Sequence, residues 1–391
     1  MTRQDRHWKV VVTDGRIGAS RLAGTFDYAP GELVPLLRGR LVGARLHLAD
    51  LGPAVGTTAL LSRSRVGRLP VDEMATAVLA AGRVLPARDF DLAALRAMNA
   101  DVAVSIAEVD LGSGLLEPLR PLRVRLLLQG GVLTLRQIDA RLGAGRLSGE
   151  LQLDGRRPIA VLSTRLRWDD VALDHWIHQK RRTGTEPYVS GRLSGSASLT
   201  GQGGSTARIL ASLNGSARTE LQGGSVSHLA VELAGLDLAA SLGLLITGDD
   251  RLRVSCAVAD LVAVDGVFRP RRMVLETSAS AIWVGGSLSL ASETLDLRAV
   301  VSPRGFSPVS LRTPLTVRGS FANPQVTFDR GGIGRKLGTA ALLAIMNPLA
   351  ALLPLVELAS ATTDGSSRRA DGKGCAGLVA PAALRQLHPP G

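Results

Sequence analysis

Short segments of alternating apolar and polar residues recur along this chain, and glycine or proline separates each segment from the next. In LRVRLLLQGGVLTLRQ (residues 122–137), apolar residues fill every second position before the glycines, and Arg123 and Arg125 lie between them. Successive side chains of a strand point to opposite faces, and Gly130 and Gly131 permit the positive φ angles of a tight turn. The segment therefore predicts a β-hairpin whose apolar face carries Leu122, Val124, Leu126, Leu128, Leu133 and Leu135.

Two segments nearer the C-terminus, residues 285–301 and 314–329, repeat this scheme. A four-residue turn separates the alternating stretches of the first, and a polar connection from glycine to proline separates those of the second. Successive hairpins of this kind are typical of an antiparallel sheet with one apolar face. The residues expected on that face are Leu288, Leu290, Leu295, Leu297, Leu315, Val317, Val326 and Phe328.

An internal repeat supports a sheet built from similar units. The segments GRLSGELQLDG (145–155) and GRLSGSASLTG (191–201) agree at seven of eleven positions. Repeats of this kind indicate stacked units that cannot bury their apolar faces alone. Gly149 and Gly195 share the strand face of the leucines, where a missing side chain leaves room for curvature or for the close approach of another group.

Length and composition favour one extended body. A chain of 391 residues is longer than a typical single compact domain, so either two domains or a long repetitive structure is expected. Its 44 glycines exceed the usual share of ~7%, and aromatic residues make up only 3%. We predict a mostly β fold: an elongated, curled antiparallel sheet with a few short helices and a C-terminal helical segment.

The chain divides into five predicted regions. Residues 1–56 form an N-terminal β segment, 57–86 a linker, 87–330 the main β body, 331–360 apolar helices and 361–391 a mobile tail. Apolar spacings typical of one helix face predict short helices within 87–100, 172–182 and 235–248, which would cover the ends of the sheet.

The region from Leu337 to Val356 contains no charged residue over twenty positions, which is long enough in principle to span a bilayer. Pro348 and Pro354 interrupt it, and this favours a helical hairpin that packs on the sheet or lies at an interface. The first fifteen residues lack the apolar core of a signal peptide, since charged residues stand in its place.

The formal net charge of +12 favours anionic partners, either nucleic acid or the head groups of a membrane surface. A basic surface without any particular partner is the alternative. The arginines are spread along alternating strands, and the few aromatic residues are not interleaved with them as platforms for bases. The sequence therefore predicts no nucleic-acid binding.

No residue pattern indicates catalysis, a cofactor or a metal. Asp174 and His178 are four residues apart, as in some metal sites, but a polar helix surface is the favoured interpretation because no third ligand is nearby. GGIGRKLG (331–338) lacks the Lys-Ser/Thr ending of a phosphate loop, and the chain contains neither Gly-x-Ser-x-Gly with a suitable triad nor Cys-x-x-Cys. The protein is expected not to be an enzyme.

The two cysteines, Cys256 and Cys375, are too few for a disulfide scaffold or a zinc ribbon. In an oxidising compartment they could form a single bridge, and the sequence leaves this open.

Several stretches together resemble the C-terminal region of the AsmA family of bacterial envelope proteins. Each stretch alone is a weak motif, but their order and combination are fairly specific and cover most of residues 15–360. The stretches are LRGRLVGARLHLADLGPAVG (37–56), VLPARDFDLAALRAMNADVAVSIAEVDLG (84–112), LRVRLLLQGGVLTLRQIDARLGAGRLSGELQLDG (122–155), and residues 210–238, 251–300 and 310–329.

This resemblance implies a β-groove whose apolar inside holds phospholipid acyl chains. Such proteins are anchored in the inner membrane by an N-terminal helix, project into the periplasm, and serve phospholipid movement and outer-membrane assembly. Compared with this family pattern, the chain is expected to be without the N-terminal anchor and to correspond to the later part of the family's length. A misplaced start, a fragment of a longer protein, or a partner that supplies the rest would each account for this. A periplasmic location would also make the Cys256 to Cys375 bridge reasonable.

The sequence thus predicts a non-enzymatic envelope protein that holds or conducts phospholipid along a groove lined by the apolar residues of the hairpins. Phospholipid and a membrane surface are the expected partners, together with envelope proteins. The alternative is a structural or assembly factor for outer-membrane proteins, in which the groove is closed by the protein's own helices or by a partner and carries no lipid.

Overall fold

The computed structural model describes residues 2–4, 7–31, 34–51, 85, 87, 89–111, 116–177, 187, 189–227, 251–278, 280–303, 315–321 and 323–328. Within these residues, eighteen strands form one sheet. The strands are β1 (Thr2–Gln4), β2 (His7–Ile17), β3 (Ser20–Ala29), β4 (Leu36–His47), β5 (Asn99–Asp110), β6 (Leu122–Gln129), β7 (Val132–Leu142), β8 (Gly145–Asp154), β9 (Ala160–Ala172), β10 (Arg192–Gly203), β11 (Asn214–Gln222), β12 (Ser225–Ser227), β13 (Arg251–Val264), β14 (Val267–Thr277), β15 (Ser280–Ser289), β16 (Thr294–Pro303), β17 (Leu315–Ser320) and β18 (Pro324–Phe328).

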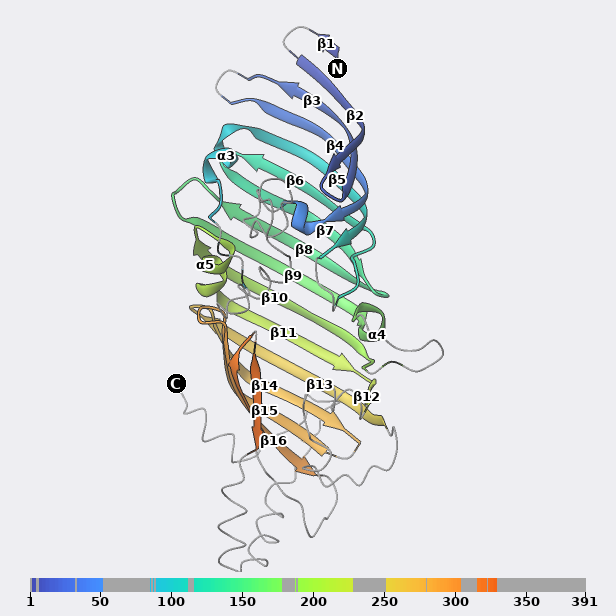
Figure 1. The fold of residues 1–391 in the computed structure, drawn as a ribbon, viewed down its shortest axis with the longest axis vertical. Helices are drawn as coiled ribbons and strands as arrows, with labels where there is room; N and C mark the ends of the chain where they lie inside the picture. The colour runs from blue at the N-terminus through green and yellow to red at the C-terminus, as the bar shows by residue number, and fades with distance from the viewer. Residues whose placement is uncertain are drawn as a thin grey trace, which may run out of the picture.

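The strands are arranged in chain order, so the sheet extends from the N-terminal strands at one end to the C-terminal strands at the other (Figure 1). The one local exception is β12, which pairs with β13 on the same side as β11. In the part of the chain that the structure describes, β1 and β18 each have a single neighbouring strand. The sheet is therefore open, which confirms the predicted mostly β, curled architecture; the predicted C-terminal helices lie outside the described residues.

One strand pair departs from the antiparallel prediction. β4 and β5 are parallel, with Leu36 opposite Asn99 and His47 opposite Asp110. Parallel neighbours require a crossover of a dozen or more residues, whereas antiparallel neighbours need only a short turn. The long connection between His47 and Asn99 provides that crossover, and it joins the predicted N-terminal β segment and main β body into one continuous sheet.

The predicted hairpins are present. Gly130 and Gly131 connect β6 to β7 with φ angles of 55° and 85°, the two positive values of a type I′ turn. Four residues connect β15 to β16, as the sequence indicates. β17 pairs with β18 across the short connection between Ser320 and Pro324. Each hairpin keeps its apolar residues opposite one another, because directly paired residues share a face.

Gly149 and Gly195 allow groups of neighbouring strands to lie close to their Cα atoms, as their positions in the repeat predict. A Cβ atom on Gly149, where φ is +149°, would lie 2.1 Å from the carbonyl oxygen of Arg165 on the next strand. A Cβ atom on Gly195 would lie 2.3 Å from the carbonyl oxygen of Arg218 and 2.7 Å from the Trp168 ring. The group that fills the space over Gly195 is therefore an indole ring of the same chain.

In the described part of the chain, three short α-helices lie at the edges of the sheet. α3 (Leu92–Ala97) falls within the predicted 87–100 segment, and its N-cap Asp91 accepts a hydrogen bond from the backbone N–H of Ala94. α4 (Leu173–Trp176) falls within the predicted 172–182 segment. α5 (Thr206–Ala211) was not predicted, although Ser205 provides a typical N-cap signal. Figure 1 shows α3 and α5 at one edge and α4 at the opposite edge; the predicted helix within 235–248 lies outside the described residues.

The end of the connection between β4 and β5 returns along the edge that carries α3 and α5. The backbone N–H of Leu85 donates to Glu293 at the turn between β15 and β16, with a distance of 3.3 Å. Farther along, Asp89 forms a β-bridge with Ser205, and the N–H of Phe90 donates to the carbonyl of Gly204 at 2.8 Å. This segment thus links strands that are far apart in the sheet before it enters α3.

Asp50, in the 3-10 helix η1 (Leu48–Leu51), fixes the turn between β2 and β3. Its Oδ2 atom accepts hydrogen bonds from the N–H groups of Ala19 and Ser20, both at 2.9 Å, and from the Ser20 hydroxyl at 2.7 Å. The Ser20 hydroxyl in turn accepts a hydrogen bond from the N–H of His47. The hydrogen bond from the Ser20 hydroxyl, followed by those from the backbone, holds the pKa of Asp50 below its ordinary value of 3.8 despite partial desolvation.

We expect the substitution Asp50→Ala to lower the free energy of unfolding at pH 7 by about 1–2 kcal/mol, because it leaves the two N–H donors without an anionic acceptor. A carboxyl whose pKa is lowered by folding stabilises the fold above its ordinary pKa and loses that contribution as the pH falls through the folded-state value. Urea denaturation should therefore show a gap between the wild type and Asp50→Ala that narrows below pH 3.8. A gap that is independent of pH would contradict this assignment.

Candidate functional site

The strand register joins apolar positions from nearly every strand into one row across the sheet. Directly paired residues connect Val10 on β2 to Pro324 on β18, and each residue between them pairs with the next. Every member is apolar except for one threonine and the glycines. This central row consists of Val10, Phe26, Gly39, Val102, Leu126, Leu135, Leu151, Thr164, Leu199, Gly215, Ala263, Phe268, Leu288, Leu295, Gly319 and Pro324.

The structure brings the predicted lining residues from both ends of the chain onto the face that carries the central row, which we call the apolar face. Leu122 and Leu128 flank the row on β6, and Leu315 and Val317 flank it on β17. The Cα atoms of Val326 and Phe328 pair with those of Val317 and Leu315, although their side chains lie outside what the structure describes. Leu128 and Leu315 are buried, and the other members with described side chains are half-buried: Leu122, Val124, Leu126, Leu133, Leu135, Leu288, Leu290, Leu295, Leu297 and Val317.

The opposite face, which we call the polar face, is solvated over most of the sheet. Arg123 and Arg125 are exposed on it, as the alternation predicts. Arg125 donates two hydrogen bonds to the carboxylate of Asp101 on β5, at 2.9 and 2.8 Å. These hydrogen bonds, with the positive charge of Arg125, hold the pKa of Asp101 below its ordinary value. Similar pairs join Arg165 to Glu150 and Arg318 to Asp296 along the same face.

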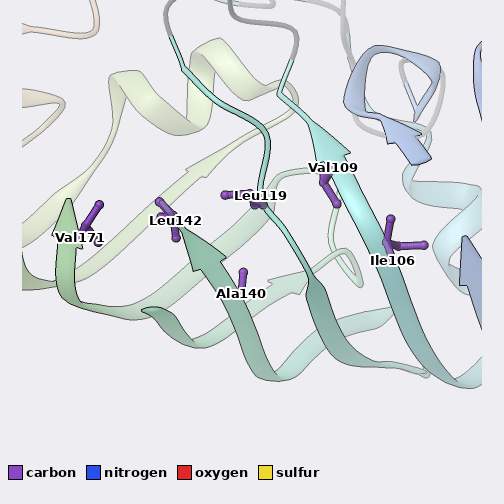
Figure 2. Packing of buried hydrophobic residues seen from close by; sticks show 6 residues of the cluster. All are labelled: Ile106, Val109, Leu119, Ala140, Leu142 and Val171. Carbon is purple, nitrogen blue, oxygen red and sulfur yellow. The ribbon is translucent and has the colours of Figure 1, made fainter. Parts of the chain in front are cut away.

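A hydrophobic cluster covers the apolar face toward the edge that carries α4. Figure 2 shows six of its buried residues, which come from β5, β7, β9 and the segment before β6. Leu119 belongs to that segment and packs over the strands, while Trp176 of α4 packs against the same cluster. The buried members are Ile106, Val109, Leu119, Ala140, Leu142 and Val171.

A second cluster covers the apolar face toward the opposite edge. Ala100, Val102 and Leu128 are its buried members, and Leu95 of α3 packs against them together with Met98 just beyond that helix. Val104 packs against both clusters. The two clusters therefore meet on β5, and from β7 onward they leave a strip of the apolar face between them.

Residues of this strip remain half-buried. Leu135, Leu151, Leu166 and Leu199 lie along it on four different strands and belong to neither cluster. In a sheet whose apolar face packs against a second layer, such leucines would be fully buried. Their partial exposure indicates an apolar surface that the side chains of the described residues shelter but do not cover. We call this surface the open strip.

Two features of the sheet have no counterpart among the predictions from the sequence. Trp168 lies on the apolar face and donates from Nε1 to the hydroxyl of Thr219 at 3.2 Å, so its ring extends across β10. On β13 to β15 a third cluster lies on the side opposite the central row, because Val274 pairs with Trp283 while Leu275 pairs with Ile282. The continuous apolar run AIWV (281–284) is the sequence signal for strands buried on both faces.

Cys256 belongs to this third cluster and is buried, with its Sγ atom 3.2 Å from Oε2 of the fully buried Glu276. Cys375 lies outside the described residues, so the predicted bridge to it remains a prediction. Within the ranges that the structure describes, no group of three or more His, Cys, Asp or Glu side chains is arranged to hold a metal ion. Asp174 lies on α4, and His178 lies outside the described residues.

Comparison with known proteins decides the family. The model of the AsmA family matches residues 12–273, which is more than half of the chain. The chain belongs to the AsmA family. It is also 33% identical over 350 residues to the AsmA family protein YhjG of Escherichia coli (strain K12), an alignment that covers 88% of this chain and 50% of that protein.

This AsmA-family chain spans about half the length of the curated relative it matches. No solved structure matches it. Among its described residues, no helix is both long and apolar enough to cross a membrane. The predicted apolar segment Leu337 to Val356 lies outside those residues.

Proposed function

We propose that this AsmA-family protein holds phospholipid acyl chains along the open strip of its apolar face, in the envelope of a diderm bacterium. The observation that carries the proposal is the half-buried state of the four leucines of the open strip, which lie in or beside the continuous row of directly paired residues. A row that served only as a folding core would be covered by a second layer over its whole length. Here α3, α4 and the Leu119 segment cover its two sides instead.

The chemistry of the strip suits hydrocarbon. Transfer of hydrocarbon from water contributes ~0.8 kcal/mol per CH₂, so a chain of about a dozen carbons would gain close to 10 kcal/mol even before the lipid's second chain is counted. The central row offers leucine, valine, phenylalanine and glycine, with Thr164 as its one side chain that carries a hydroxyl group. Thr164 donates that hydroxyl to the carbonyl oxygen of Glu150, so it presents no free polar group to the lipid.

The length of the apolar face suits transfer between sites. The central row crosses sixteen strands spaced ~4.8 Å apart, so the apolar face has a contour on the order of 70 Å along the sheet. One acyl chain spans about half of the ~30 Å hydrocarbon core of a bilayer. Several lipids could therefore lie in sequence, and a lining without specific polar contacts would let them slide.

Location and partners are part of this proposal. We place the protein in the periplasm next to the inner membrane, with phospholipid as cargo and envelope proteins as partners. Its net charge of +12 would favour contact with anionic head groups at a membrane surface. A structural role without lipid cargo is the second candidate, since the clusters over both sides of the apolar face show that parts of this chain also cover it.

Native mass spectrometry of protein purified without detergent separates the two candidates. Lipid transport predicts one or more phospholipid molecules bound per protein at near-stoichiometric levels. A structural role predicts protein that carries no lipid, and that result would refute the proposal if the same preparation is folded by circular dichroism.

A further inference from the structure

A hollow of about 410 Å³ lies on the polar face, on the side of the sheet opposite the proposed lipid strip. The charged residues that line it are Arg123, Asp139, Arg141, Arg146, Asp169 and Asp170. They come from β6, β7, β8 and β9, whose hydrogen-bonded backbones hold their Cα atoms in a fixed arrangement. A water molecule fills ~30 Å³ of liquid, so the hollow has room for a phosphate-sized group and its hydration.

The three carboxylates in the hollow are already neutralised. Arg146 donates from Nε to Asp139 at 2.7 Å. Asp169 and Asp170 are paired with arginines of β9 and β10: Arg167 lies 3.1 Å from Asp169, and Arg192 lies 2.9 Å from Asp170. None of the three acids is therefore left to balance a further cation.

Two arginines keep an unbalanced charge as a result. Arg141 lies directly opposite Arg146, an arrangement of like charges that destabilises a strand pair. Arg123 lies directly opposite Asp139, but the carboxylate of Asp139 is engaged by Arg146 instead. Across the described ranges, neither Arg123 nor Arg141 has a carboxylate within ion-pair distance.

We propose that this hollow binds a phosphate group, with Arg123 and Arg141 as its two principal donors. Guanidinium groups recognise phosphate through charge-assisted, often bidentate hydrogen bonds. The backbone of Arg141 is fixed on both sides: its N–H donates to the carbonyl of Pro121, and its carbonyl accepts from the N–H of Arg120. The phosphate group belongs either to a lipid head group or to a small solute in solution.

The test measures the binding of inorganic phosphate to the full chain by isothermal titration calorimetry at low ionic strength. We expect the double substitution Arg123→Gln with Arg141→Gln to weaken binding at least tenfold. Arg136→Gln is the matched control, because Arg136, like Arg141, is exposed on the polar face of β7. Like Arg141, it also lies opposite an arginine whose charge is balanced by a carboxylate, in this case Arg125. Arg136 does not line the hollow, so its substitution should change the affinity less than twofold.

Flotation with phosphatidylglycerol vesicles distinguishes the two sources. If the double substitution reduces both phosphate binding and vesicle retention, the ligand is a lipid head group; if it reduces phosphate binding alone, the ligand is a soluble phosphate compound. The proposal is overturned if the wild type binds no phosphate. It is also overturned if the double variant is folded by circular dichroism and binds phosphate as tightly as the wild type, or if Arg136→Gln weakens phosphate binding as much as the double substitution does. Lipid binding in the open strip does not depend on any of these results.

Discussion

The substitution Gly149→Val is expected to destabilise the sheet by about 3 kcal/mol or more. Gly149 has a φ angle of +149°, and a Cβ atom there would lie 2.1 Å from the carbonyl oxygen of Arg165. Because that oxygen belongs to the backbone of the neighbouring strand, the clash cannot be relieved by a change of rotamer. β8 and β9 would have to separate at the middle of the sheet.

Gly130→Asn is the matched control for this prediction. Gly130 also has a positive φ angle, +55°, but a Cβ atom there would meet nothing within 4 Å. Asparagine tolerates the left-handed conformation, so this change should cost less than ~1 kcal/mol. Denaturation in urea measures both variants. If Gly149→Val and Gly130→Asn have equal free energies of unfolding, the backbone of β9 does not lie as close to Gly149 as the structure places it.

The substitution Leu151→Asp is expected to reduce the phospholipid that copurifies with the protein at least tenfold. Leu151 lies in the central row, half-buried on the open strip. A carboxylate there would keep its water shell, and burying a charged group under hydrocarbon without a partner costs several kcal/mol. The lipid would lose a continuous stretch of apolar contact at the middle of the strip.

Gln152→Asp provides the control for Leu151→Asp, because Gln152 is the next residue of β8 and is exposed on the polar face. It introduces the same charge one position away and should leave the lipid content unchanged. If Leu151→Asp fails to fold, the uncharged variant Leu151→Ser replaces it in the same measurement of copurified phospholipid. Equal lipid loss from Leu151→Asp and Gln152→Asp would show that charge alone, rather than its position on the apolar face, governs lipid binding.

Local patterns were sufficient to predict the hairpins. Gly130 and Gly131 mark the turn after Leu128, and the alternation on each side of it fixes which residues share a face. The alternation also places Arg123 and Arg125 on the polar face without knowledge of any tertiary contact. These predictions succeed because the period of two along a strand is a local property of the chain.

Contacts between distant parts of the chain could not be predicted in the same way. The parallel pairing of β4 and β5 depends on where a long connection returns, and at its end Leu85 contacts Glu293 while Asp89 pairs with Ser205. The cover that Leu119 provides over the apolar face depends on tertiary packing as well. Only the apolar run at 281–284 gave a local signal for the cluster on the opposite face.

The most direct test of lipid binding places a photo-crosslinking amino acid at single positions on the two faces. Leu135 and Leu295 lie in the central row on β7 and β16, and their chain neighbours Arg136 and Asp296 are exposed on the polar face. After irradiation in cells, mass spectrometry would detect a phospholipid adduct. We predict adducts at Leu135 and Leu295 and none at Arg136 and Asp296. Adducts on both faces alike, or on neither face, would contradict a lipid-carrying apolar strip.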